Sequence, residues 1–396
     1  MKTKELVLVF IVAAIFRFTV VAPAFFDSTR PLGPPHLDTH EYYALSQSLS
    51  HGIYRIGNTD WVLRPPGYPA FLALNWLVFG PDPRSAVLLQ VLLGGIMAVV
   101  VALWACRLAG RREALASGIL AGLAPVTGLF SGFLLTEALF TTSIALGLLF
   151  FRRAPALSGF ILGLSTLMRP MGIYIACALA LFHLIRKDWA KAGFLTLSFL
   201  LPVLPWLARN KLIHGKALIS TQHEATVFLY AAPYTMMEER GIGYEEALSA
   251  LRDTLGCDDL WAAALDPELA GEVSKRGIGY ILRHPKAYAL AHLKGFVRCF
   301  YGLGKDFTRM LWGNDLAVLI IVSWGWFYAL ATYILALLGF LRLREKGLLL
   351  AVVVFLLVFL PGPDGSFRFR SPAEPILAVA AGVGLVSLVN RLSRPA

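Results

Sequence analysis

Long apolar stretches recur along almost the whole chain, and they constrain its fold more than any other feature. Residues 85–105 and 316–341 contain no charged side chain, and each is as long as the roughly 20 residues that an α-helix needs to cross a membrane. The 396 residues are 57% hydrophobic and only 15% charged, whereas soluble domains carry about 25% charged residues. This pattern excludes an ordinary soluble protein and predicts an all-α polytopic membrane protein.

Ten stretches are predicted to be membrane spans, and the basic residues between them predict an orientation. The predicted spans are residues 6–24, 85–105, 114–129, 136–151, 156–168, 171–185, 193–207, 316–341, 348–360 and 376–389. Loops rich in Lys and Arg stay in the cytoplasm, and such loops follow every second span. With Lys2, Lys4, Arg391 and Arg394 near its ends, the chain is expected to have both termini inside, in the plasma (inner) membrane. Residues 6–24 lack a signal-peptide cleavage site, so they are expected to remain as the first span.

The formal net charge of +11 raises the question of nucleic-acid binding. The basic residues, however, occur as short pairs at the ends of apolar spans rather than on one polar face. Such pairs orient a membrane protein, and they are not the footprint of a surface that binds a phosphate backbone. Nucleic acid is therefore not an expected partner.

Three parts are expected along the chain. Residues 1–208 form an N-terminal transmembrane module, in which residues 25–83 are the first outer loop. Residues 209–312 form a small helical extracytoplasmic insert, and residues 313–396 form the C-terminal transmembrane helices. The division follows the one long polar segment, which separates the two groups of apolar spans.

Apolar periodicity predicts helices outside the spans as well. In the first outer loop, interfacial helices are expected at residues 38–49 and 67–79. In the insert, helices are expected at residues 244–251, 260–273 and 286–299.

The four cysteines show no spacing that is typical of a metal site. Cys257 and Cys299 both fall in the predicted insert, so a disulfide between them is one alternative if the insert is extracytoplasmic. Cys106 and Cys177 lie in or beside apolar spans and are expected to be small buried hydrophobes. The chain also has no Walker loop and no glycine-rich loop after a strand. No metal and no nucleotide cofactor are expected.

Charged residues that break the positive-inside pattern are expected to mark a functional site. The prediction places ten of them outside, close to span ends: Arg64, Arg169, Arg209, Lys211, Arg368 and Arg370, with Asp38, Glu41, Glu137 and Glu374. Charges near the membrane are costly and are usually paired or functional; pairing with a neighbouring carboxylate or with lipid head groups is the alternative for each one. Guanidinium groups suit phosphate oxygens, and a carboxylate can serve as general base. The set favours a transfer reaction in which a lipid-linked phosphate leaves.

Several short motifs resemble those of the GT-C glycosyltransferases, in the bacterial branch related to protein O-mannosyltransferases and to the lipid A aminoarabinose transferase. The motifs are Asp38-x-x-Glu41-Tyr42, Arg64-Pro65-Pro66-Gly67-Tyr68-Pro69, Leu135-Thr136-Glu137-Ala138-Leu139, Arg169-Pro170, Pro205-Trp206 with Arg209-Asn210, and Arg368-Phe369-Arg370 with Pro372-x-x-Pro375. Each motif is weak alone, but their order and sidedness make the set fairly specific. The resemblance covers most of the chain except residues 236–300.

The resemblance implies an inverting enzyme that takes its sugar from a polyprenyl phosphate, with no further cofactor. Asp38 matches the catalytic carboxylate and is expected to be the general base, which deprotonates or orients the acceptor hydroxyl; it could also cap the helix that begins there. Glu41 is expected to be either a second acid or a residue of the helix surface. The arginines expected at the donor phosphate are Arg64, Arg169, Arg368 and Arg370, with simple capping as the alternative for Arg169.

Five further residues are expected to shape the substrate site. Glu137 opens a span and is expected to support a cavity arginine, with direct substrate contact as the alternative. His223 and Glu224 are expected near the acceptor or the sugar, without a role as metal ligands. Tyr42 and Tyr68 could stack on a sugar ring.

Other functions fit the same charges. The chain could be a transporter or flippase of polyprenyl lipid or small anions, or a ligase that moves a whole glycan from a lipid diphosphate. Transporters often contain inverted repeats and charges near mid-span, and neither is evident here, which favours the enzyme. The expected partners are membrane lipids, the polyprenyl-phosphate sugar and an acceptor glycan, lipid or protein. The sugar, the acceptor and the oligomeric state stay open.

Overall fold

The computed structural model describes residues 1–34 and 38–393, and almost all of its regular structure is helical. The N-terminal part contains α1 (Thr3–Val21), α2 (Pro23–Phe26), α3 (Asp38–Ser50), α4 (Gly67–Phe79), α5 (Pro83–Leu108), α6 (Arg111–Gly122), α7 (Pro125–Phe130), α8 (Glu137–Phe150), α9 (Pro155–Thr166), α10 (Gly172–Ile185) and α11 (Trp189–His214). Strands β1 (Arg55–Ile56) and β2 (Thr59–Asp60) form a short antiparallel hairpin. Arg394, one of the basic residues on which the predicted orientation rests, lies outside the described residues.

The rest of the chain continues the helical architecture. It contains α12 (Gln222–Thr226), the π-helix η1 (Val227–Ala231), α13 (Ala232–Arg240), α14 (Tyr244–Leu255), α15 (Leu260–Leu265), α16 (Pro267–Arg283), α17 (Pro285–Cys299), α18 (Lys305–Trp312), α19 (Asp315–Leu343), α20 (Glu345–Phe359), the 3-10 helices η2 (Gly362–Asp364) and η3 (Phe367–Ala373), and α21 (Glu374–Leu392). The prediction of an all-α membrane fold is confirmed.

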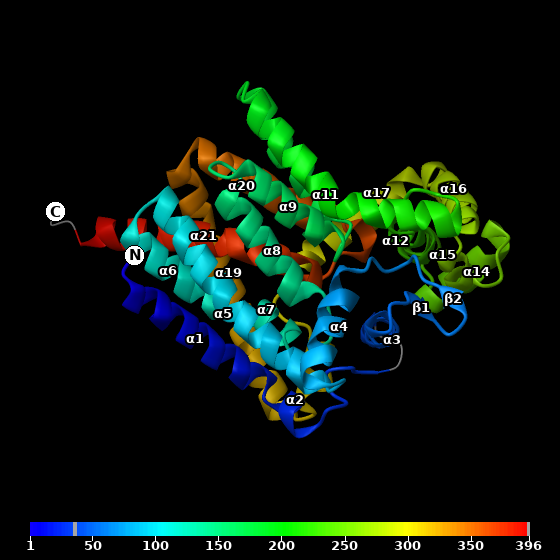
Figure 1. Ribbon diagram of the computed structural model, residues 1–396, viewed down its shortest axis with the longest axis horizontal. Helices are drawn as coiled ribbons and strands as arrows, with labels where there is room; N and C mark the ends of the chain where they lie inside the picture. Colours follow the sequence, from blue (N-terminus) through cyan, green and yellow to red (C-terminus); the bar gives the residue numbers. More distant parts are fainter. Residues whose placement is uncertain (35–37, 394–396) are drawn as a thin grey trace.

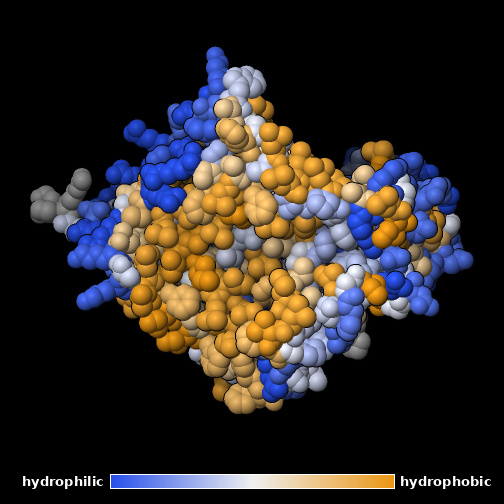
Figure 2. Space-filling model, in the orientation of Figure 1, coloured by the Kyte–Doolittle hydropathy of each residue, from blue (hydrophilic) through white to orange (hydrophobic). Residues whose placement is uncertain are grey.

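Most predicted spans coincide with one helix, but span 6–24 continues past α1 into α2, and span 114–129 is divided into α6 and α7. Four helices meet the requirements for crossing a membrane by length and composition. Those four are α5, α11, α19 and the continuous segment Phe367–Leu392. The apolar helices α4, α8, α9 and α10 are shorter. Figure 2 shows an apolar surface across the middle of the molecule, between hydrophilic regions at either end. Both termini lie at one end and helices α14 to α16 at the other (Figure 1). The total of ten spans and their orientation stay predictions.

The centre of the helix bundle is α21, which is buried along most of its length. It packs closely on α19 and α6 because small residues stand at the crossings: a Cβ on Gly339 would lie 1.7 Å from the Ala380 carbonyl oxygen. Such small-residue contacts let helix backbones approach each other where the surrounding lipid supplies no hydrophobic drive. The packing fixes η3, which immediately precedes α21, against the ends of the neighbouring helices.

A buried arginine ties α1 to α6 and α7. Arg17 is fully buried in α1, and its guanidinium donates to the Gly122 oxygen at 2.6 Å and to the Ala121 oxygen at 3.1 Å, both at the end of α6. It also donates to Thr127 Oγ1 at 3.1 Å. The last carbonyls of a helix have no partner inside the helix, and a cation there is favourable. Arg17 therefore caps α6, a role that the sequence motifs do not reveal.

Two further predicted boundaries are wrong, for reasons of proline and capping chemistry. The predicted span 193–207 ends too early, because α11 continues through Pro202 and Pro205 to His214. The predicted insert helix 260–273 is two helices, because Asp266 accepts from the backbone N–H groups of Glu268 and Leu269 and so starts α16. Pro267 then takes the first helical position, where its missing N–H costs nothing.

The helices α12 to α16 surround an apolar cluster of their own. Cys257 lies at the edge of this cluster, whereas Cys299 is buried in the main helix bundle and points its Sγ at the Val358 oxygen, 3.5 Å away. Both cysteines are free. The alternative of a disulfide between them is therefore wrong, because the two side chains belong to different cores.

The Arg17→Met substitution is expected to destabilise the protein. It removes the guanidinium while leaving the carbonyl oxygens of Ala121 and Gly122 buried without a donor, which costs about 2–4 kcal/mol. The matched control is Arg84→Met, because Arg84 makes only an exposed pair with Asp82, which contributes about 1 kcal/mol or less. Thermal unfolding of the purified proteins in detergent measures the difference; equal midpoints for the two variants would contradict the capping role.

Candidate functional site

The first half of the candidate site is built by the start of α3 and one arginine. Asp38 and Glu41 stand three residues apart in the first turn, which places both carboxylates on one face. Arg64 lies between them: its Nη2 is 2.8 Å from Asp38 Oδ1, and its Nε is 2.6 Å from Glu41 Oε2. Arg64 is only 6% exposed, so this guanidinium has left water and depends on the two acids.

The second half connects Asp38 to the far end of the chain. Arg368, in η3, bonds Asp38 Oδ2 through its Nη2 at 3.2 Å and Glu137 Oε1 through its Nε. Glu137 Oε1 also accepts from Arg169 Nη2 at 3.1 Å. We call these six residues the charge cluster: Asp38, Glu41, Arg64, Glu137, Arg169 and Arg368. Arginines and carboxylates alternate through it, so its formal charge is zero when all six are ionised.

Close backbone contact brings the two halves together. The Gly67 N–H donates to the Leu167 oxygen at 2.7 Å, and a Cβ on Gly67 would lie 2.7 Å from that same oxygen. Only glycine lets the turn after Arg64 approach the end of α9 so closely. Arg169 follows Leu167 by two residues, so the contact between Gly67 and Leu167 sets the spacing between Arg64 and Arg169. Pro65 and Pro66 stiffen the same turn, because each has a fixed φ.

Arg370 does not join the charge cluster. Its side chain is fully buried on the other side of η3, where its Nε is 2.7 Å from Glu374 Oε1 and its Nη1 is 3.2 Å from the Cys299 oxygen. In a short 3-10 helix, residues two positions apart point in different directions. Arg368 and Arg370 therefore contact different partners, and Arg370 ties η3 to α17 and α21.

The predicted aromatic and insert residues have different locations. The Arg64 guanidinium lies 5.8 Å from the centre of the Tyr42 ring, and Tyr42 in turn packs edge-on against Tyr68. Tyr68 is fully buried and donates to Gln90 Oε1 at 2.8 Å, so its ring is part of the core under the site. His223 and Glu224 lie in α12, which packs on α15 and α16. Within residues 1–34 and 38–393, neither makes an ion pair with the charge cluster.

Burial and three guanidinium groups act in opposite directions on Asp38. Burial disfavours its charged form, but Arg64, Arg368 and Arg169 together outweigh burial and lower the pKa of Asp38 to about 2. Both of its oxygens are hydrogen-bonded to arginines. Asp38 is therefore ionised at neutral pH and has little affinity for a proton. A carboxylate in this state orients cations and hydroxyl donors well and accepts protons poorly.

Asp364 lies beside the charge cluster, and the sequence motifs did not single it out. It ends η2, four residues before Arg368, and its carboxyl interacts electrostatically with Arg368, Asp38 and Arg298. Burial raises the pKa of Asp364 to about 7. In the sequence, Asp364 could have been recognised as an acid in a tight turn directly before the motif of Arg368. The turn is the run Pro361-Gly362-Pro363-Asp364-Gly365.

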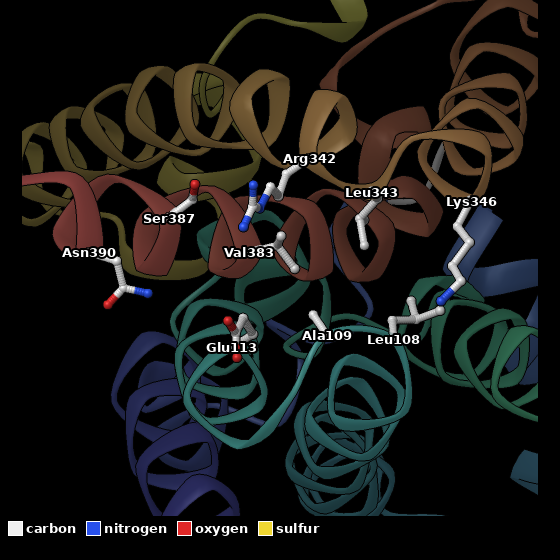
Figure 3. A pocket seen from close by; sticks show the side chains of 9 residues that line it. All are labelled: Leu108, Ala109, Glu113, Arg342, Leu343, Lys346, Val383, Ser387 and Asn390. Carbon is white, nitrogen blue, oxygen red and sulfur yellow. The ribbon is translucent and has the colours of Figure 1, made fainter.

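In the described parts of the chain, no group of three or more His, Cys, Asp or Glu side chains is arranged to hold a metal ion. A cavity of about 260 Å³ does occur at the other end of the bundle, lined by Glu113 of α6, Arg342 of α19, Lys346 of α20 and Asn390 of α21, among others. Figure 3 shows these side chains around the opening between the helices. Residue 390 follows Glu374 by 16 positions of α21, so this cavity is roughly 24 Å from the start of that helix. It is separate from the charge cluster.

Known proteins resemble the chain in part of its sequence and in its fold. Residues 63–208 match the family model described as dolichyl-phosphate-mannose-protein mannosyltransferase. The apo crystal structure of the Archaeoglobus fulgidus oligosaccharyltransferase is 14% identical, with a TM-score of 0.57 over 99% of this chain and 51% of that one. The complex of the same organism's oligosaccharyltransferase AglB with an inhibitory peptide and a dolichol-phosphate is 15% identical, with a TM-score of 0.53 over 98% and 50%.

A third structure, ArnT from Cupriavidus metallidurans bound to undecaprenyl phosphate, is 16% identical, with a TM-score of 0.47 over 99% of this chain and 79% of that one. No curated protein matches the chain significantly by sequence. The chain spans about half the length of the oligosaccharyltransferases that it matches. The resemblance predicted from the short motifs is confirmed: the chain shares the fold of these oligosaccharyltransferases, and residues 63–208 match the model of the dolichyl-phosphate-mannose-protein mannosyltransferase family.

Proposed function

We propose that the protein transfers a sugar from a polyprenyl-phosphate donor to an acceptor hydroxyl, with inversion, at the extracytoplasmic end of the helix bundle. The observation that carries the proposal is the charge cluster itself. Three guanidinium groups converge there within reach of carboxylates, and the chain has the fold of the archaeal oligosaccharyltransferases. The matched family is named for transfer from dolichyl phosphate mannose, and AglB was solved with a dolichol-phosphate bound. Both names support a lipid-phosphate donor here.

The arginines are proposed to hold the donor phosphate by exchanging partners. A guanidinium has five N–H donors, and Arg64 uses only two of its nitrogen atoms on Asp38 and Glu41. A phosphate placed between Arg64 and Arg368 would compete with Asp38, which contacts both. The cluster is neutral without substrate. If one carboxylate moves away or takes up a proton, the net charge of the cluster becomes positive, and this charge strengthens binding of the phosphate. The charge that develops on the leaving phosphate is stabilised by groups already in place.

Asp38 is proposed to orient the acceptor hydroxyl and the two arginines. Its low pKa makes the alternative role, proton removal, inefficient at neutral pH. Tyr42, beside Arg64, offers a ring face near the same position, and Glu137 holds Arg169 and Arg368. The positive-inside pattern supports an outward-facing site, since the charge cluster lies at the opposite end of α21 from the basic Arg391.

The Asp38→Asn substitution is expected to lower the rate of sugar transfer about 100-fold or more, because two arginines lose the group that orients them. The measurement is release of polyprenyl phosphate by purified protein in nanodiscs, with a panel of polyprenyl-phosphate sugars and native membrane lipids as acceptors. Asp27→Asn is the control, because Asp27 lies in the same loop but is exposed. Equal turnover by the two variants would contradict a role for Asp38 in the reaction.

The Arg64→Met substitution is expected to weaken donor binding about tenfold or more, because it removes a phosphate-binding group, takes the arginine from Glu41 and leaves Asp38 with Arg368 alone. Binding is measured by titrating labelled polyprenyl phosphate into nanodiscs. Arg55→Met is the control, because Arg55 is exposed on β1. Unchanged donor affinity in Arg64→Met would refute the phosphate role. Tight lipid binding with no release of polyprenyl phosphate by the wild-type protein would favour a transporter instead.

A further inference from the structure

The Asp364 carboxylate lies near charged groups without bonding to any of those in the described residues, and its backbone is held firmly. Among the described residues, Asp364 makes no ion pair and its side chain no hydrogen bond, whereas Asp38, Glu41 and Glu137 are each bound by arginine. The Arg298 guanidinium donates to the carbonyl oxygens on both sides of it, those of Pro363 and Gly365. The position is thus fixed while the carboxylate stays available.

Close packing adds to that rigidity. A Cβ on Gly365 would lie 2.4 Å from the Gly295 oxygen of α17, and one on Gly295 would lie 2.0 Å from the Gly362 oxygen. The loop that carries Asp364 therefore lies directly on α17 with no room for side chains between the two backbones. A group that is fixed in this way needs little reorganisation before it reacts.

The elements packed around this loop present charged and titratable groups to it. They are Tyr288, His292 and Arg298 from α17, Tyr230 from η1 and Tyr234 from α13. Arg368, Asp38 and Arg169 of the charge cluster act on Asp364 electrostatically. Burial raises the pKa of Asp364, the nearby Asp38 raises it further, and the arginines lower it only in part, so that it is about 7. A base works best when its pKa is near the working pH. Asp364 meets this condition and Asp38 does not.

We infer that Asp364 is the general base of the transfer and that Asp38 is its orienting partner, an inference that rests on the proposed function. In this step the acceptor hydroxyl oxygen forms a bond to the anomeric carbon of the sugar. The bond from that carbon to the phosphate oxygen breaks, and its electron pair leaves with the polyprenyl phosphate. The hydroxyl proton passes to the ionised carboxylate of Asp364.

Charge accounting around the cluster supports this assignment. When the sugar leaves, the lipid phosphate changes from a diester with one negative charge to a monoester that gains a second. Proton uptake neutralises Asp364 in the same step, so the total charge near Arg368 and Arg298 is unchanged. In a site shielded from water, a reaction that conserves local charge avoids the large cost of a buried unpaired charge.

The Asp364→Asn substitution is expected to lower kcat for sugar transfer about 100-fold or more, while affinity for polyprenyl phosphate stays unchanged. In the wild-type protein the rate is expected to fall as the pH drops below about 7, since the base is then protonated, and Asp364→Asn is expected to lose this dependence. His292→Gln tests the histidine that α17 presents to the same loop, and this variant is expected to keep the pH dependence. Asp258→Asn, an exposed acid of the insert, is the control for charge loss, and Asp364→Glu is expected to restore part of the rate.

Full turnover by Asp364→Asn, or its low rate together with an unchanged pH profile, would overturn the assignment while leaving the proposed function intact. If Asp364→Asn does not fold, the wild-type profile decides, because a rate independent of pH between about 6 and 8 is incompatible with a base of this pKa. A wild-type protein that transfers no sugar from any donor would instead refute the proposed function.

A different observation concerns the basic end of the bundle, where two cavities adjoin. Beside the cavity of Figure 3 lies another of about 370 Å³, and Arg342 and Ser387 line both. Together the cavities are bordered by four basic residues: Arg342, Arg344, Lys346 and Arg391. Within residues 1–34 and 38–393 none of these four makes an ion pair, although Glu113 also lines the first cavity. A cavity bordered by unpaired cations is suited to bind an anion.

The backbone at Arg344 is strained in a way that supports a function. Its φ of 54° and ψ of −127° form a conformation that favours glycine. Strained residues of this kind persist where the surrounding structure holds them in place, and they cluster at active sites and ligand clamps. Here the tight turn between α19 and α20 places a guanidinium at the rim of the second cavity.

We propose that these cavities bind the phosphate group of an anionic membrane lipid. The cations border the apolar helices α19 and α21, so a head group can occupy the hollow while its acyl chains stay against apolar surface. Basic pockets between transmembrane helices recognise lipid head groups in this way. Free inorganic phosphate is the other source of the same chemistry.

Thermal unfolding in zwitterionic detergent micelles tests the proposal, with phosphatidylglycerol, phosphatidylcholine or inorganic phosphate added. Phosphatidylglycerol is expected to raise Tm of the wild-type protein, and Arg344→Gly is expected to abolish the rise while relieving strain. Lys187→Gly is the matched control, because Lys187 also has a positive φ (60°) but lines neither cavity. A rise caused equally by inorganic phosphate would identify a phosphate site that does not need a lipid. No rise with phosphatidylglycerol, or an equal rise in Arg344→Gly, would overturn the proposal.

Discussion

The interaction on which the candidate site depends is the bridge that Arg368 makes between Asp38 and Glu137. It joins the first outer loop to the loop before the last helix, 330 residues away along the chain. Charged groups with so little access to water are stable only in mutual contact. The helix bundle therefore has to place α3, α8 and η3 at the same end, and the close packing of α21 on its neighbours achieves this.

The cluster combines rigid support with balanced charge. Gly67 fixes the distance between the turn after Arg64 and the end of α9, and Arg370 anchors η3 from its other side. Because three guanidinium groups face three carboxylates, a phosphate can enter only by taking over contacts that Asp38 or Glu137 now makes. One further acid, Asp364, lies beside the cluster, and its charge can change near neutral pH to compensate for the charge of the phosphate.

Much of this arrangement could be predicted from the sequence. The apolar pattern located most helices of the bundle but not the break between α6 and α7. Exceptions to the positive-inside pattern indicated all six cluster residues as outward-facing charges near span ends, with Glu137 as the expected support of a cavity arginine. Sequence alone could not separate Arg368 from Arg370, because the direction of each side chain is set by a 3-10 helix. It also missed Arg17 and Asp364. Their roles depend on contacts with residues more than 60 positions away, which a lone arginine in a span or a lone acid in a proline-rich turn does not indicate.

The most direct test of the central claim is a cryo-EM structure of the protein in nanodiscs with polyprenyl phosphate bound. The account predicts density for the phosphate between Arg64 and Arg368, with the contacts of Asp38 to those arginines lengthened or lost and Asp364 within reach of an acceptor position. A phosphate bound elsewhere, with the pairs of the charge cluster unchanged, would contradict it.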